Sequence, residues 1–237
     1  MHVDSNHNCA ASATSIASDL INDVRIATIG LATGRSVESF YVHLLQAHYG
    51  NHINLSPCHF LMLDEYIGLP PGDNRLFKEQ LESSFLSNIL KKTGHFIYPD
   101  SSISDQDKMV QQFATKSGEF NVNLQILGIG RNGHLGFNEP GSTSTSVTRV
   151  VELSQSTLND LDAVDWQNTA EPRYAVTRGL ADIIASETIF LFAFGVAKAP
   201  ALRSALAEPS SDDCPASVLQ NHSNVHVFAD DDAASLL

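Results

Sequence analysis

Short apolar runs that alternate with stretches of helical periodicity constrain the fold of this chain more than any other feature. Each run has the length of a buried strand and ends in a turn rich in glycine or polar residues. The strand-like runs are Val24–Leu31, His59–Leu63, Asn121–Ile129, Thr188–Phe194 and Val225–Ala229, and Ser146–Leu153 is expected to be an edge strand. The helical stretches are Ser12–Asn22, a segment from Val37 that ends before Gly50, Phe77–Lys92, Asp107–Ser117, Val176–Ile184 and Gly195–Ala207. This alternation predicts an α/β fold in which a doubly wound, mostly parallel sheet is flanked by helices.

The composition is that of a single acidic domain. The 237 residues are 43% hydrophobic and show no break that resembles a linker, so we expect one domain spanning residues 1–237. The formal charge of −13 argues against a nucleic-acid partner or an anionic-membrane surface. It leaves room for a local basic pocket, because a small phosphorylated substrate needs only a few well-placed donors.

Cysteine usage and the N-terminus favour a cytoplasmic location. The chain has three cysteines, Cys9, Cys58 and Cys214. They are odd in number, widely spaced and without a C-x-x-C pair, which fits a reducing compartment. No apolar run reaches the roughly 20 residues that span a bilayer, and the first twelve residues lack the basic and apolar regions of a secretion signal.

Four of the ten histidines lie close together in the sequence, at His43, His48, His52 and His59. The first two share one expected helix at a spacing that does not place them on one face, and the other two flank the next strand. We therefore expect no metal site among them.

Polar residues gather in the segments that follow four of the strands. These segments are Gly30–Ser36, Asp64–Gly68, Gly128–Glu139 and Gly195–Lys198. Ligands of parallel α/β sheets bind outside the carboxyl ends of the strands. The four segments are therefore expected to converge on one site.

The stretch Leu124–Ser142, LQILGIGRNGHLGFNEPGS, is the most distinctive of these. Its first glycines spell G-x-G-x-x-G after a strand, which is the form of the dinucleotide-binding fingerprint. That fingerprint requires a helix to open at its last glycine. Here Gly136, Pro140 and Gly141 follow within eight residues. No ordinary helix begins there, and a dinucleotide site is rejected.

Three side chains in these segments can move or balance protons. His134 is a candidate because a histidine side chain can both donate and accept a proton. Glu139 places a carboxylate in the same loop. Asp64 follows directly on a buried strand, where partial desolvation raises the pKa of a carboxyl toward that of a useful base. The alternative is structural: His134 and Glu139 would tie a turn together, and Asp64 would cap the next turn.

The Gly30–Ser36 turn is suited to bind an anion. It lies between a strand and a helix, so backbone N–H groups and the positive end of the helix point into it. Thr33 and Ser36 add hydroxyl donors. The turn is not a Walker A loop, because the Gly-Lys-Ser/Thr ending is missing, and a plain strand-to-helix turn is the alternative.

Together these segments resemble the glucosamine-6-phosphate deaminase family, also called glucosamine-6-phosphate isomerases, which shares its fold with 6-phosphogluconolactonases. The similarity runs from about Ile29 to the C-terminus, and LDEYIGLP and LGIGRNGHLGFNEPG carry it. It implies a Rossmann-like three-layer sandwich and a reaction that opens the ring of an amino-sugar 6-phosphate, moves a proton from C2 to C1 and releases ammonia to leave a ketose 6-phosphate. It implies no cofactor, a small amino-sugar phosphate as partner, and is compatible with a homo-oligomer.

Residue roles follow from the same resemblance. It makes Asp64 the base that carries the C2 proton and His134 the group that transfers the ring-opening proton. Glu139 would orient His134 and balance its charge, and Asn132 stands where some members have an aspartate. The expected substrate or phosphate contacts are Thr33, Gly34, Arg35, Ser36, Glu65, Gly130 and Lys198.

The chain departs from the family pattern in several places. Arg35 replaces the second glycine of the family's Thr-Gly-Gly-Thr turn, and no arginine stands near Asn159–Ala163, where many deaminases have one. We expect Arg35, Arg173 or Arg178 to supply the missing charge. Residues 156–183 look more like the galactosamine-6-phosphate branch, which leaves the epimer open. The short N-terminus lacks the strand with which many relatives begin.

Two other functions fit parts of the pattern. A lactonase would use water to attack an ester carbonyl, but that branch usually has Asp-Glu-Arg and a GHTASLFP-like ending where this chain has Asp64-Glu65-Tyr66 and GHLGFNEP. A sugar-phosphate sensor would keep the pocket without the chemistry. It would not need all three of Asp64, His134 and Glu139.

Overall fold

The computed structural model describes residues 1–89, 95–154, 157–158 and 172–237. Within these residues, seven strands form one parallel sheet in the order β1-β10-β9-β6-β2-β3-β5. Their bounds are β1 (His2–Val3), β2 (Thr28–Leu31), β3 (His59–Met62), β5 (Phe96–Ile97), β6 (Leu124–Gly128), β9 (Thr188–Ala193) and β10 (Val225–Ala229). The predicted doubly wound, mostly parallel sheet is therefore confirmed.

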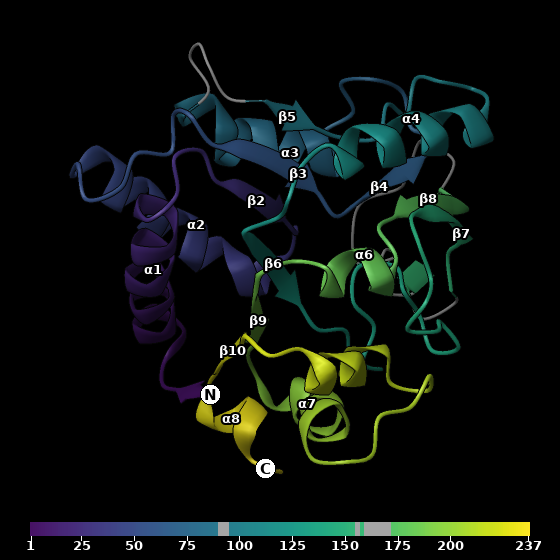
Figure 1. Ribbon diagram of the computed structural model, residues 1–237. Coiled ribbons are helices and arrows are strands. Elements are labelled where there is room, and N and C mark those ends of the chain that lie inside the picture. Colours follow the sequence, from purple (N-terminus) through teal and green to yellow (C-terminus); the bar gives the residue numbers. More distant parts are fainter. Residues whose placement is uncertain (90–94, 155–156, 159–171) are drawn as a thin grey trace.

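Helices cover both faces of this sheet. They are α1 (Asn6–Asn22), α2 (Arg35–Tyr49), α3 (Phe77–Ser84), α4 (Gln106–Gly118), α6 (Leu180–Ile184), α7 (Ala199–Leu206) and α8 (Asp231–Ala234), with 3₁₀ turns at η1 (Leu86–Asn88), η2 (Val196–Lys198) and η3 (Pro215–Asn221). Figure 1 shows α1 and α2 on one side of the sheet and α6 and α7 on the other. Burial on both faces explains why all six residues of β9 are apolar or small and buried.

A second, smaller sheet begins one residue after β3 ends. Its strands are β4 (Asp64–Ile67), β8 (Tyr174–Thr177) and β7 (Arg149–Glu152), paired antiparallel in the order β4-β8-β7. Leu63 is hydrogen-bonded to both sheets. Its N–H donates to Leu31 O of the large sheet, and its carbonyl accepts from Arg178 N next to the small one, both at 2.9 Å. The expected edge strand in Ser146–Leu153 is confirmed as β7, but it is an edge of the small sheet.

Two helix predictions are wrong in part. Val176–Ile184 contains the end of β8 before α6 begins, because Ala175 and Val176 are buried in antiparallel pairing with β4 and β7 that the local sequence does not reveal. The helix that begins at Phe77 ends at Ser84, well before Lys92. Phe85 leaves helical geometry at φ −127° and buries its ring against Tyr41 and Phe60. Of the rest of that prediction, residues 90–92 lie outside the described part of the chain.

The expectation that the N-terminus lacks a strand is also wrong. His2 and Val3 pair in parallel with Phe228 and Ala229, which adds β1 to the edge of the large sheet. The His2 ring stacks on Phe228 at 4.8 Å between centroids, so cross-strand packing supports a strand too short to be found from periodicity.

A buried polar side chain on β6, that of Gln125, lies against the neighbouring strand β2. The Gln125 side chain accepts from Arg178 Nη1 at 2.6 Å and donates to Ile126 O at 2.9 Å. It occupies the space beside Gly30, where a Cβ would overlap the Gln125 amide. Gly30 therefore makes room for the side chain that pairs with the buried Arg178.

We expect Gly30→Ala to lower the free energy of unfolding by about 1–3 kcal/mol, because the added methyl displaces an amide that is held at both ends. Gly118→Ala is the matched control, since a Cβ there meets no atom within 4 Å. It should change stability by less than about 1 kcal/mol. Urea denaturation of the two variants measures both effects, and equal stabilities would contradict the packing argument.

Candidate active site

A cleft of about 630 Å³ lies at the carboxyl ends of the parallel strands. It straddles β2 and β6, the point where the strand order reverses and where ligands of doubly wound sheets bind. Residues from all four predicted segments line it, so their expected convergence is confirmed. The lining includes Ala32–Ser36 after β2, Leu63 and Asp64 after β3, Gly128–Arg131, His134, Gly136 and Phe137 after β6, and Phe194, Ala197 and Lys198 after β9, together with Phe77.

The part of the cleft beside α2 has features that favour an anion. α2 begins at Arg35, and Gly34 before it takes φ +116°, a value that favours glycine. The first N–H groups of a helix have no partner within the helix, so those of α2 face the cleft with the positive end of its dipole. The predicted contacts Thr33, Gly34, Arg35 and Ser36 all lie on this wall.

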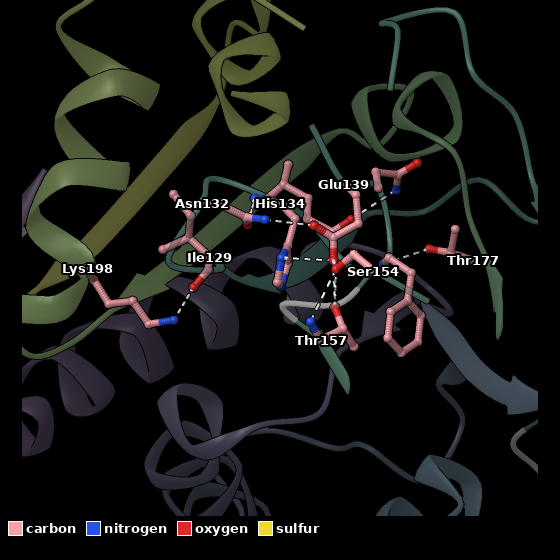
Figure 2. Close-up of polar contacts among 11 residues, drawn as sticks. Ile129, Asn132, His134, Glu139, Ser154, Thr157, Thr177 and Lys198 are labelled. Carbon is pink, nitrogen blue, oxygen red and sulfur yellow. Dashed lines mark hydrogen bonds and ion pairs between the residues drawn. The ribbon is translucent and has the colours of Figure 1, made fainter. Parts of the chain in front are cut away.

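Besides Arg35, two positively charged side chains line the same cleft. Lys198, which the sequence predicted, donates from Nζ to Ile129 O at 2.6 Å (Figure 2). Arg131 was missed, because sequence reasoning searched for a replacement arginine only in other segments. Its place directly after the apolar strand, inside the glycine-rich loop, was the signal that could have found it.

Two of the arginines considered for this charge do not line the cleft. Arg178 is only 5% exposed, and its guanidinium donates to Gln125 Oε1 and to Asp182 O at 2.8 Å, so that hypothesis is wrong. Arg173 lies on the exposed approach to β8. Residues 159–163, where many deaminases place an arginine, are outside the described part of the chain.

Asp64 lies at the junction of the two sheets with its side chain at the cleft. Only 7% of the residue is exposed, and its carboxyl makes no hydrogen bond within the described residues. Burial, with a smaller contribution from the negative charge of Glu65, raises the pKa of Asp64 to about 8. A carboxyl with free lone pairs and a raised pKa is suited to accept a proton from carbon.

Glu65 does not line the cleft, contrary to the sequence prediction. Successive residues of a strand point to opposite faces, so Asp64 at the cleft turns Glu65 away from it. Its carboxylate accepts from the backbone N–H of Tyr66, Phe77 and Lys78 at 2.8–2.9 Å. Burial raises the pKa of Glu65 and these donors oppose the rise. Its role in the structure is to hold the start of α3 against β4.

The side chains of His134 and Glu139 lie close together in the loop after β6 (Figure 2). His134 Nδ1 lies 3.5 Å from Glu139 Oε1, and the His134 side chain is a quarter exposed at the cleft. Asn132 does not line the cleft; its Nδ2 donates to Glu139 Oε2 at 2.7 Å and its Oδ1 accepts from His134 N at 3.3 Å. The structure thus brings the three side chains together and places only the imidazole at the cleft.

The environment of Glu139 is the opposite of that of Asp64. Burial raises the pKa of Glu139, but the neighbouring His134 imidazole and the hydrogen bonds from Thr157 and Asn132 outweigh it and bring the pKa to about 2. Glu139 is therefore ionised throughout the physiological range, while Asp64 holds its proton near neutrality. Two carboxyls with opposite shifts in one region provide a mobile proton and a fixed charge.

Two glycines permit these side chains to come close to the backbone. A Cβ on Gly130 would overlap the ring of His134. A Cβ on Gly136, where φ is +56°, would lie 3.0 Å from both Asp64 Oδ2 and Thr177 Oγ1. Gly130 therefore acts by making room for the imidazole, and Gly136 does the same for Asp64.

The loop opens no helix before β7, as the sequence predicts. Within the described residues, no three His, Cys, Asp or Glu side chains are grouped to hold a metal ion. No helix in that part of the chain is long and apolar enough to cross a membrane. Cys9, Cys58 and Cys214 are buried, free thiols.

Sequence comparisons point to one family. The profile of glucosamine-6-phosphate isomerases/6-phosphogluconolactonase matches residues 3–228. A glucosamine-6-phosphate deaminase of Ligilactobacillus salivarius is 37% identical over 217 residues, which are 91% of this chain and 89% of the relative. One of Rhodococcus opacus is also 37% identical, over 89% of this chain and 82% of the relative.

Solved structures give the same fold. A monomeric glucosamine-6-phosphate deaminase matches with a TM-score of 0.93 at 32% identity, covering 100% of this chain and 99% of the other. The 6-phosphogluconolactonase of Trypanosoma brucei matches with a TM-score of 0.80 at 17% identity, over 100% and 97% of the two chains, which is a similarity of fold.

We expect Asp64→Asn to stabilise the protein increasingly as the pH rises from about 4 to about 8. The pKa of Asp64 is about 8 in the folded protein against an ordinary value of 3.8. The wild-type carboxyl therefore costs no stability below pH 3.8, and the cost grows until it levels off above pH 8. The amide has no such cost, so the difference should reach about 2–5 kcal/mol at pH 9.

Urea denaturation between pH 5 and pH 9 measures this difference. Asp213→Asn is the matched control, because Asp213 is exposed on the loop before η3. Its difference from wild type should stay constant over the range. A pH-independent difference for Asp64→Asn would contradict the burial argument.

Proposed function

The chain belongs to the family of glucosamine-6-phosphate isomerases and 6-phosphogluconolactonases, and from this we propose that it converts an amino-sugar 6-phosphate to the ketose 6-phosphate and ammonia. Glucosamine 6-phosphate is the proposed substrate, because curated relatives that share 37% identity over about nine tenths of the chain are deaminases of that sugar. The observation that carries the proposal is the cleft that joins Asp64 to the His134–Glu139 pair beside an anion-binding helix start.

The first step is ring opening, for which the hemiacetal O1–H must lose a proton and the ring oxygen must gain one. A single group that accepts and then donates can serve both atoms. His134 lines the cleft, and the ionised Glu139 beside Nδ1 favours the imidazolium that forms after the first transfer. The step leaves an open-chain aldehyde at C1.

The second step moves a proton from C2 to C1. The aldehyde makes the C2 proton acidic, and the Asp64 carboxylate takes it to give an enol that carries the amine. Return of the proton to C1 leaves an imine at C2, and a water molecule hydrolyses it to the ketone and ammonia. C1 is reduced and C2 oxidised within one molecule, so no outside oxidant or reductant takes part.

Asp64 must be ionised to begin this step, and its raised pKa makes it a strong base when it is. Leu63, Phe77 and Phe137 provide apolar walls beside it. Apolar walls keep water away from the enol. Water in the cleft would otherwise exchange protons with the enol and with Asp64. The buried position thus serves the chemistry at the cost of the carboxylate's own solvation.

The 6-phosphate is proposed to lie on the α2 side of the cleft. Thr33, Ser36 and the first N–H groups of α2 would donate to it, and Lys198, Arg35 and Arg131 would supply positive charge. These three cations stand out in a chain of net charge −13.

The solved relative is monomeric, and light scattering of this chain under assay conditions will show whether it also acts as one copy.

Ammonia release tests the function. A coupled glutamate dehydrogenase assay with glucosamine 6-phosphate and galactosamine 6-phosphate, side by side, should show turnover, with glucosamine 6-phosphate preferred. Asp64→Asn should lower kcat by about 10²- to 10⁴-fold, the usual effect of losing a general base. Asp213→Asn should be as active as wild type.

Other outcomes identify the alternatives. Preference for the galactosamine epimer would keep the reaction and change the substrate. A folded protein that releases no ammonia but hydrolyses 6-phosphogluconolactone would be a lactonase. Binding of both sugars without turnover would make it a sensor.

Charge removal tests the phosphate site. We expect Arg131→Gln and Arg35→Gln each to raise KM about 10-fold with kcat within about twofold, because a charge-assisted contact to the phosphate is present in substrate and transition state alike. Lys108→Gln, an exposed lysine on α4, is the control. An unchanged KM in both arginine variants would leave Lys198 and the helix start as the phosphate site.

A further inference from the structure

Two hydroxyl groups reach the same oxygen of Glu139 that faces His134 (Figure 2). Thr157 Oγ1 donates to Glu139 Oε1 at 2.6 Å, and Ser154 Oγ lies 3.0 Å from it. His134 Nδ1 is farther from that oxygen, at 3.5 Å. The hydroxyls come from the chain beyond β7, more than a dozen residues after the loop that holds Glu139.

The local backbone fixes this pair of hydroxyls. Ser154 Oγ accepts from Thr157 N at 3.1 Å, and Ser154 O accepts from Leu158 N at 2.9 Å. Next to Ser154, Leu153 N donates to Arg173 O at 2.9 Å, beside β8. The small sheet therefore anchors the hydroxyls, whereas the large sheet carries Glu139.

We propose that Thr157, held by Ser154, is a positioning residue for ring opening: its hydroxyl fixes the Glu139 carboxylate and, through it, the His134 imidazole. The inference rests on the proposed function, because it assigns Thr157 to one step of that reaction. It concerns neither the C2 proton nor the phosphate.

The geometry shows why one hydroxyl matters. Asn132 holds Oε2 of Glu139, and Thr157 holds Oε1, so the carboxylate is fixed at both oxygens. Both donors are neutral, so they solvate the charge without cancelling it, and the charge remains available to the imidazole. Without Thr157, the half-buried carboxylate keeps only the longer contact from Ser154 at Oε1, so its orientation, and with it that of His134, is held less firmly.

Thr157 is also separate from substrate binding. Neither Thr157 nor Ser154 lines the cleft, so loss of the hydroxyl should change kcat and leave KM alone. Thr157 is the cleaner probe of the two, because the Ser154 hydroxyl also accepts from the backbone N–H of Thr157, so its removal would disturb the backbone as well as Glu139.

The test compares Thr157→Val, Thr157→Ser and Thr143→Val by ammonia release. Valine keeps the shape and removes the hydroxyl, so kcat should fall about 10-fold with KM within about twofold. Serine restores the donor and should recover kcat to within about threefold of wild type. Thr143→Val, which removes a surface hydroxyl that faces Thr145, should match wild type.

Binding of an acyclic analogue separates ring opening from the rest. Glucosaminitol 6-phosphate, the open-chain alcohol obtained by reducing the substrate, needs no ring opening. Its Kd by calorimetry should be the same within about twofold in wild type and Thr157→Val. Thermal unfolding confirms that each variant is folded, and Thr157→Ala replaces the valine variant if valine does not fold.

Three results would overturn the inference: wild-type kcat in Thr157→Val, a serine variant as slow as the valine variant, or weaker binding of the analogue in step with the loss of kcat. Absence of ammonia release by the wild-type protein would instead overturn the proposed function, and the inference with it. The two failures are therefore distinguishable in one set of assays.

Discussion

The change of sheet at Leu63 is the constraint on which the site depends. Leu63 bonds to Leu31 on one side and to Arg178 on the other, so the chain leaves the large parallel sheet and enters the small antiparallel one within a single residue. The next residue is Asp64, paired with Thr177. It is buried because two sheets meet around it, yet it reaches the cleft because the large sheet ends there. A carboxyl on an ordinary turn would be solvated, and its pKa would stay near 3.8.

The carboxyl groups near this junction have different environments and therefore different roles. Asp64 has no hydrogen-bond donor among the described residues and an elevated pKa, whereas Glu139 is surrounded by donors and has a pKa near 2. Glu65, one residue along β4, faces away and holds α3. Environment, and not residue type, decides which carboxyl carries a proton, which fixes an imidazole and which caps a helix.

Glycines and buried polar groups determine how closely the side chains of the site can pack against the backbone. Gly130 and Gly136 let His134 and Asp64 approach the loop backbone more closely than a Cβ would allow. Beneath them, Gly30 makes room for Gln125, which bonds to the buried Arg178. Arg178 in turn follows the strand that pairs with Asp64. These buried polar contacts connect β2, β6 and the end of β8 beneath the cleft. Substitutions among them should therefore alter the geometry of the site.

The sequence by itself determined the class of fold, the positions of its main strands along the chain and the segments that meet at the site. Strand-length apolar runs followed by glycine turns are local signals, and parallel sheets place the ends of such runs together. Asp64, His134 and the Gly30–Ser36 turn were found in this way. Only the tertiary structure decided which side each neighbour faces: it turned Glu65 away, buried Arg178, ended α3 at Phe85, paired β1 with β10 and brought Thr157 to Glu139. Those outcomes depend on pairing and packing between distant segments, for which a single sequence carries no local signal.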